Sequence, residues 1–287
     1  MVLVDADANK NSRSDEDLTL SDPNVKLIPS LVTGDPFTLG EGDTDNINVR
    51  FINMVTHNNT IFNVTKTDVP SSIEIQSFSD RALVETTEMT HSDGMLINLG
   101  TDMGDLRNTI SESDASDDST TWSTDFRGFN LLNYDLRSFN TDANNIGSNG
   151  IKVSVVVTSA FFDSATNHTY THQSIPVKEL SGLQGLELLD DSADVLFDTV
   201  RYADELDISI LYEWKTDNTK IEQGTYPIVT DFFSFGFSDD GNQAHERVSN
   251  QIIRLELEED ADNSGKFVGT LEYTISCLLY TSPSPRD

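Results

Sequence analysis

Apolar and polar residues alternate one by one in several stretches of this sequence, and this pattern restricts the fold more than any other feature. It runs through residues 47–52, 72–78 and 251–258. Successive side chains of a β-strand point to opposite sides of the sheet, so alternation gives one apolar and one polar face. Leu255 and Leu257 are thus expected on a buried face. The charged side chains of that stretch belong to the other face: Arg254, Glu256 and Glu258.

Three more strands are predicted where β-branched and aromatic residues gather, in the ranges 151–160, 206–214 and 228–237. A fourth covers residues 266–274, and the turn Asp-Ala-Asp-Asn-Ser-Gly at 260–265 separates it from 251–258. Asp, Asn and Gly tolerate the positive φ angles of a tight hairpin, so these two strands are expected to pair.

Helical periodicity is sparse and predicts only two short helices, at residues 103–110 and 183–189. Neither is long enough to organise a core. Frequent turns between short strands are typical of immunoglobulin-like (Ig-like) sandwiches. The sequence therefore predicts an all-β protein of tandem Ig-like antiparallel β-sandwich domains with a few short helices.

The polar, glycine-containing segment 140–150 predicts a domain boundary near residue 145. Residues 1–145 and 146–276 are thus expected to form separate sandwich domains, each truncated at its outer end because the chain begins and ends in strand-like sequence. Residues 277–287, which contain the only cysteine, resemble the translation of a transposase sequencing adapter. We interpret 277–287 as a non-native tail that does not belong to the fold.

The charge of the chain decides which partners it can have. Asp and Glu number 49 against 18 Lys and Arg, a formal net charge of −31. Such a chain repels nucleic-acid phosphates and anionic lipid surfaces, and it attracts cations. No stretch approaches the about 20 apolar residues of a membrane span. The alternative is that the charge serves only solubility or a salty medium.

One segment has the ligand spacing of a calcium loop. Oxygen-bearing side chains fall at positions 1, 3, 5, 7 and 12 of residues 5–16: Asp5, Asp7, Asn9, Asn11 and Glu16. Alternate spacing lets such side chains converge on one hard cation, and a late carboxylate closes the shell. Lys10 stands where an EF-hand requires glycine, so a strand–loop calcium site is predicted instead. The alternative is a polar loop capped by its own side chains.

Three glycosylation sequons are present, beginning at Asn58, Asn63 and Asn167. They are modified only in an exported protein, and in an Asn- and Thr-rich chain they also arise by chance. The sequence contains no nucleophile elbow, P-loop or dinucleotide-binding motif. Its carboxylates are too numerous for an acid–base pair to stand out, and we predict that the protein is not an enzyme.

Several strings of residues stand out at 4–12, 16–18, 28–31, 226–236, 246–259 and 269–273. They resemble the surface-layer (S-layer) proteins of ammonia-oxidising archaea. The resemblance implies an exported glycoprotein of tandem Ig-like domains that coats the cell as a homo-oligomeric two-dimensional lattice. It also implies bound divalent cations and a permeable acidic barrier at the cell surface.

Two other functions fit the same sequence. A calcium-dependent secreted adhesin, or another carbohydrate- or protein-binding β-sandwich module, would also be acidic and built of strands. A secreted polymer-degrading enzyme would require carboxylates clustered in a deep cleft.

Overall fold

The computed structural model describes residues 1–5, 15–40, 47–58, 61–102, 105–106, 127–141, 146, 150–158, 167–170, 172–173, 178–180, 182–190, 207–214, 219–237, 242 and 247–270. These residues form β-strands joined by turns and include a 3-10 helix, η1 (Arg137–Phe139). The predicted all-β class is confirmed. In this described part of the chain, no helix has the length and apolar character that crossing a bilayer requires.

The strands before residue 145 are β1 (Val2–Val4), β2 (Asp17–Leu18), β3 (Ser30–Thr33), β4 (Asn48–Asn58), β5 (Ile61–Ile75), β6 (Ala82–Thr86), β7 (Met89–Ser92), β8 (Gly94–Asp102) and β9 (Arg127–Asp135). Those after it are β10 (Ile151–Thr158), β11 (Asn167–Tyr170), β12 (His172–Gln173), β13 (Lys178–Leu180), β14 (Gln184–Asp190), β15 (Asp207–Trp214), β16 (Thr219–Ile221), β17 (Gly224–Phe237), β18 (Arg247–Arg254), β19 (Leu257–Glu259) and β20 (Lys266–Val268).

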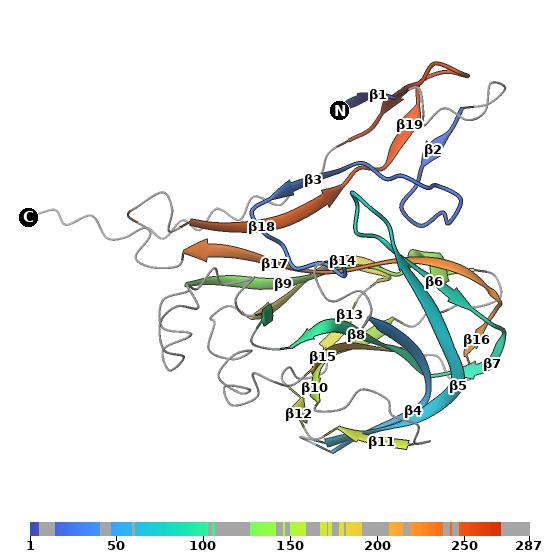
Figure 1. Cartoon of the computed structure of the whole chain (residues 1–287), viewed down its shortest axis with the longest axis vertical. Helices are drawn as coiled ribbons and strands as arrows, with labels where there is room; N and C mark the ends of the chain where they lie inside the picture. Colours follow the sequence, from blue (N-terminus) through green and yellow to red (C-terminus); the bar gives the residue numbers. More distant parts are fainter. Residues whose placement is uncertain are drawn as a thin grey trace, which may run out of the picture.

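Most strands belong to one large antiparallel sheet. Its order is β12-β10-β15-β8-β4-β5-β6-β17-β18-β3, with β9 and β14 continuing from β17, β11 on β5 and β13 on β10. The sheet folds over into two layers (Figure 1): β9, β17 and β18 lie in one, and β4, β8 and β15 lie in the other. Strands β5 and β6 connect the layers, so the sandwich is made from a continuous sheet.

The core fills the space between the two layers. Tyr134 of β9 meets Tyr212 of β15 with ring centroids 6.3 Å apart. The hydroxyl of Tyr212 lies 3.0 Å from that of Thr230 in β17, and complete burial raises the pKa of Tyr212. Phe139 of η1 stacks on Tyr226 at 4.5 Å. These contacts join both layers into one hydrophobic cluster.

Strands from both sides of residue 145 share this sheet and this core. β8 pairs with β15, and β9 pairs with both β14 and β17. The polar segment that suggested a boundary instead lies between β9 and β10, which belong to the same sheet. Among the described residues, position 145 therefore does not divide two separate cores.

A second, smaller sheet joins the two ends of the described chain. Its order is β1-β20-β19-β2, and Val2 pairs with Val268. Its inner face packs Leu257 and Phe267 into a second cluster that includes Val229 of β17. Burial of these side chains attaches the small sheet to the sandwich.

The predicted strands agree with the structure in most places. Residues 48–52 lie in β4, the described parts of 151–160 and 206–214 form β10 and β15, and 228–237 lies within β17. Residues 251–258 are divided between β18 and β19. Leu255 and Leu257 are buried as expected, and the predicted turn at 260–265 contains Asn263 and Gly265 at positive φ.

One predicted helix is wrong. Residues 183–189 fall largely in β14, where Leu186 pairs with Asn133 and Leu188 with Leu131 of β9. The spacing of the leucines fits a helical period. However, β9 supplies backbone partners for residues 184–188, and this tertiary pairing overrides a weak local preference for helix. Of the predicted helix at 103–110, Asp105 and Leu106 are helical, and the rest lies outside the described residues.

Candidate functional site

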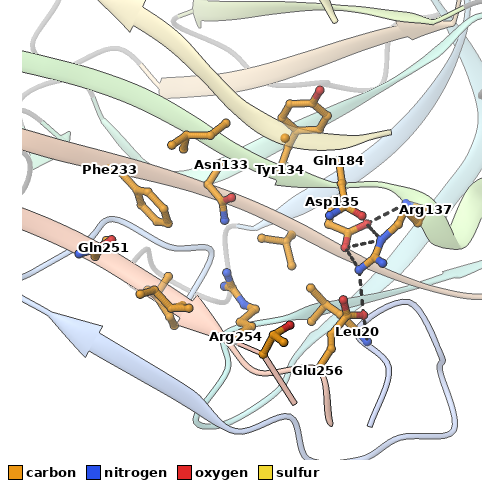
Figure 2. A pocket seen from close by; sticks show the side chains of 16 residues that line it. Leu20, Asn133, Tyr134, Asp135, Arg137, Gln184, Phe233, Gln251, Arg254 and Glu256 are labelled. Atoms are coloured by element: carbon orange, nitrogen blue, oxygen red, sulfur yellow. Dashed lines mark hydrogen bonds and ion pairs between the residues drawn. The ribbon is translucent and has the colours of Figure 1, made fainter. Parts of the chain in front are cut away.

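A cavity of about 450 Å³ lies where the small sheet joins the large one. Strands β9, β14, β17 and β18 supply most of its lining. Figure 2 shows charged groups of both signs in its wall, with Arg137 beside Asp135 and Glu256, and Arg254 pointing toward Asn133. Polar side chains from elements far apart in sequence therefore converge on this junction.

A fully buried ion pair forms the base of the junction. Arg254 of β18 contacts Asp231 of β17 through two nitrogens, at 2.5 and 2.9 Å, and the side chains are only 3% and 0% exposed. Asn133 of β9 donates to the same carboxylate at 2.8 Å. Arg254 also donates to the carbonyl oxygen of Ser79. This arginine thus ties β17 to β18 and to the turn between β5 and β6.

A second ion-pair network connects η1 with the linker between β18 and β19. Arg137 contacts Asp135 at 2.6 Å and Glu256 at 2.9 Å. Burial lowers the pKa of Arg137, but hydrogen bonds and charges from both carboxylates outweigh burial and raise it. Glu256 also accepts a hydrogen bond from the backbone N–H of Leu20 at 2.8 Å. Both carboxylates in the cavity wall are therefore held by the guanidinium group of Arg137.

A third arginine holds the segment that follows β2. Arg81 is completely buried and donates to the carbonyl oxygens of Leu20 at 2.7 Å and Asp22 at 3.0 Å, and to that of Val25. Burial lowers the pKa of Arg81 to about 10 against the raising effect of Asp22, so the side chain stays protonated at neutral pH. The cation supplies donors for carbonyl groups that no strand pairs.

The structure brings the two ends of the predicted calcium loop to one end of the small sheet. The N–H of Asp5 donates to Gly265 O at 2.9 Å, and the carbonyl of Glu16 accepts from Glu259 N at 2.8 Å. Asp7, Asn9 and Asn11 lie outside the described residues. Among the residues that are described, no group of three His, Cys, Asp or Glu side chains has the arrangement of a metal site.

Sequence reasoning missed Glu259 at this end of the sheet. The side chain is 3% exposed, and its Oε1 accepts from Gly265 N at 2.7 Å. Within the part of the chain that the structure describes, its Oε2 is buried without a hydrogen-bond partner. Continuing the alternation of Leu255 and Leu257 by two residues would have placed Glu259 on the buried face.

The sequons occupy neighbouring strands of the large sheet. Asn58 ends β4, Asn63 lies in β5, and Asn167 begins β11. Asn63 pairs with Thr169, and Asn167 pairs with Thr65. Two sequons therefore lie side by side, which gives a shared location for the predicted glycans.

A like-charge pair on the sandwich yields a pH prediction. Asp207 stands opposite Asp102, and partial burial followed by the charge of Asp102 raises the pKa of Asp207. The folded state thus holds this proton more tightly than the unfolded state, so the pair destabilises the fold above the folded-state pKa and not below both pKa values. Asp207→Asn is expected to stabilise the protein at pH 7 by roughly 0.5 kcal/mol, because solvent screens the half-exposed pair.

Urea unfolding at neutral pH and at about pH 3, below the ordinary pKa of aspartate, checks this prediction. The gain should vanish at the lower pH. Glu74→Gln, which removes an exposed charge from β5, serves as the control. An equal gain from Asp207→Asn at both pH values would contradict the proposed repulsion.

Comparison with known proteins gives no relative to draw on: no family model matches the chain, and no curated protein is similar to it.

Proposed function

We propose that the protein is a structural module of an acidic extracellular coat, an S-layer, in which copies assemble into a two-dimensional lattice around a cell. The supporting observation is that the charges at the junction are engaged with one another: Arg254 with Asp231, and Arg137 with Asp135 and Glu256. These ion pairs stiffen the fold: Arg137 connects η1 to the linker that leads into β19 of the small sheet, and Arg254 connects β17 to β18. A protein coat that resists mechanical force requires such stiffness. Catalysis instead requires a titratable side chain that remains available to the substrate.

The net charge of −31 supports the same proposal. A lattice of such modules would concentrate cations at the cell surface and repel anions, which makes it a charge-selective but permeable barrier. Glycans on Asn58, Asn63 and Asn167 would lie together at the β4–β5–β11 region of each copy.

Calcium is the cation we propose for the end of the small sheet. Asp5, Asp7, Asn9, Asn11 and Glu16 have the required ligand spacing. The unsatisfied Oε2 of Glu259 supports this assignment, because a buried carboxylate oxygen is costly unless a donor or a cation meets it. Bound calcium would fix the 5–16 segment against the turn at 260–265.

Assembly of the full chain tests the structural role. With calcium at roughly millimolar concentration, the range of extracellular calcium modules, light scattering should report growth of particles, and negative-stain electron microscopy should show ordered sheets that EDTA dissolves. A chain that remains monomeric under these conditions, with an intact β-sheet circular dichroism spectrum, would contradict the lattice proposal.

Calorimetry on the monomeric protein tests the ion site separately. Glu259→Gln combined with Asp5→Asn is expected to weaken calcium binding at least about tenfold, because two oxygen ligands lose their charge. Glu74→Gln removes an exposed charge elsewhere and should leave the affinity unchanged. Equal affinity in all three proteins would place calcium elsewhere and remove this part of the proposal.

A calcium-dependent adhesin is the second candidate. The cavity favours it, because Gln184 and Gln251 are among the residues that line it, and amide groups suit sugar hydroxyls. A glycan array probed with the monomeric chain distinguishes the two functions. Saturable binding that Gln251→Ala abolishes would favour the adhesin.

A further inference from the structure

Strand β3 forms an edge of the large sheet. It pairs with β18 on one side, with Leu31 opposite Ile253 and Val32 opposite Ile252, and it ends the strand order among the described residues. An edge strand exposes backbone donors and acceptors that can pair with another strand.

The hydrogen-bond pattern shows which backbone groups face outward. Leu255 N–H donates to Pro29 O at 2.8 Å, so residues 29 and 255 form a hydrogen-bonded pair. In an antiparallel ladder such pairs alternate with pairs whose backbone groups point away from each other. Leu31 and Thr33 therefore bond to β18, whereas the N–H and C=O groups of Ser30 and Val32 point to the open edge.

An exposed apolar patch surrounds this edge. Val32 is 57% exposed, and Leu27 and Leu31 are also exposed. Phe78 is 78% exposed and has a φ of 71°, which an aromatic residue adopts only at a cost. Its carbonyl oxygen accepts a hydrogen bond from Ser30 Oγ, which places the Phe78 turn beside the edge. A costly, outward-facing aromatic next to an open strand indicates a contact surface.

We infer that a second copy of the chain occupies this surface through antiparallel pairing of β3 with β3 of the partner. The strand Ser-Leu-Val-Thr is uncharged in a protein of net charge −31, so copies can approach there with the least repulsion. Exposed Lys26 precedes the strand and exposed Asp35 follows it. Antiparallel pairing brings the Lys26 end of each copy beside the Asp35 end of the other, which complements the charges.

The register centred on Leu31 is the one in which the outward groups of both Ser30 and Val32 find partners. Ser30 of each copy exchanges two hydrogen bonds with Val32 of the other, so the two-fold axis passes between the two Leu31 residues. Those residues then form a non-hydrogen-bonded pair, in which Cα atoms approach to about 4.5 Å. The inference deepens the proposed function, and rests on it for its biological role, by naming one contact of the lattice.

Sedimentation velocity on the full chain without calcium tests the contact. The mass should rise from 31.8 kDa toward twice that value as the concentration increases from about 1 to about 100 μM, the range in which a weak interface forms. Val32→Pro removes an outward N–H that β18 does not use, and Val32→Lys adds a charge to the edge. Both variants should stay monomeric with an unchanged thermal midpoint.

Cross-linking tests the register in a Cys277→Ser background. Leu31→Cys should form a disulfide-linked dimer on mild oxidation, because the pairing places the two copies of this residue face to face. Val268→Cys has a similar exposure, 41% against 45%, but lies on the small sheet and should remain monomeric. Equal cross-linking of both variants would contradict the register.

The outcomes separate this contact from the proposed function. A wild-type chain that is monomeric at every concentration, or a Val32→Pro variant that dimerises as well as the wild type, overturns the β3 contact. If Val32→Pro still forms ordered sheets with calcium, the lattice proposal stands and the contact is wrong. If the β3 dimer forms but no calcium condition yields sheets, the contact stands and the lattice proposal fails.

Discussion

Arg254→Ala is expected to lower the free energy of unfolding by about 3–5 kcal/mol, because it leaves a completely buried carboxylate without its cation. Among the described residues, the carboxylate of Asp231 would retain the hydrogen bond from Asn133 at 2.8 Å. The carbonyl oxygen of Ser79 would lose its donor as well. Urea unfolding followed by circular dichroism measures the loss.

Two further variants test whether the loss of stability comes from the unpaired buried charge. Asp231→Leu combined with Arg254→Met removes both charges and should recover most of the stability, because apolar residues of similar volume commonly replace buried ion pairs without loss. Lys220→Ala breaks the exposed contacts of Lys220 with Glu88 and Glu222 and should leave the unfolding midpoint unchanged. If Arg254→Ala costs no more than Lys220→Ala, the junction does not depend on the buried pair.

Phe139→Ala is expected to destabilise the protein by about 3–5 kcal/mol, since it removes a fully buried aromatic ring from the middle of the core. The ring stacks on Tyr226 at 4.5 Å and meets Phe51 and Trp214 with centroids 5.9 and 6.0 Å away. These neighbours come from β17, β4 and β15, so both layers of the sandwich would lose contacts.

Phe78→Ala is the matched control, because it deletes the same ring from a position that is 78% exposed. Its effect on thermal unfolding should be close to zero. Comparable losses from the two variants would mean that Phe139 is not central to the core. Tryptophan fluorescence adds a local reading, since Trp214 contacts Phe139 and its emission should shift to the red when the ring is removed.

The variants Phe139→Ala and Arg254→Ala test different parts of the same fold. Phe139 holds the layers of the sandwich together by burial of apolar area. Arg254, which lines the cavity at the junction, ties β18 to β17 and to the turn between β5 and β6. A coat module of the kind proposed would need both, because force passing between neighbouring copies must cross the junction as well as the core.

The sequence by itself determined the class of the fold. Alternation and β-branched clusters located β4, β10, β15 and β17, and the Asp- and Gly-rich turn at 260–265 located a hairpin. Each of these signals is local: a strand face requires only that every second residue be apolar, and a tight turn requires only residues that tolerate positive φ.

Only the tertiary structure decided which strands meet. Alternation says which face of a strand is buried but not which strand covers it, and β-pairing joins residues far apart in the chain. The boundary expected at 145 shows this, because β15 pairs with β8 across it. Arg254 is a second example. Its position on the charged face of its strand predicted exposure to solvent, but it pairs with Asp231 on β17 and both side chains are buried. For Glu259, alternation places the side chain on the buried face, but its contact with the N–H of Gly265 depends on how the turn folds back over it.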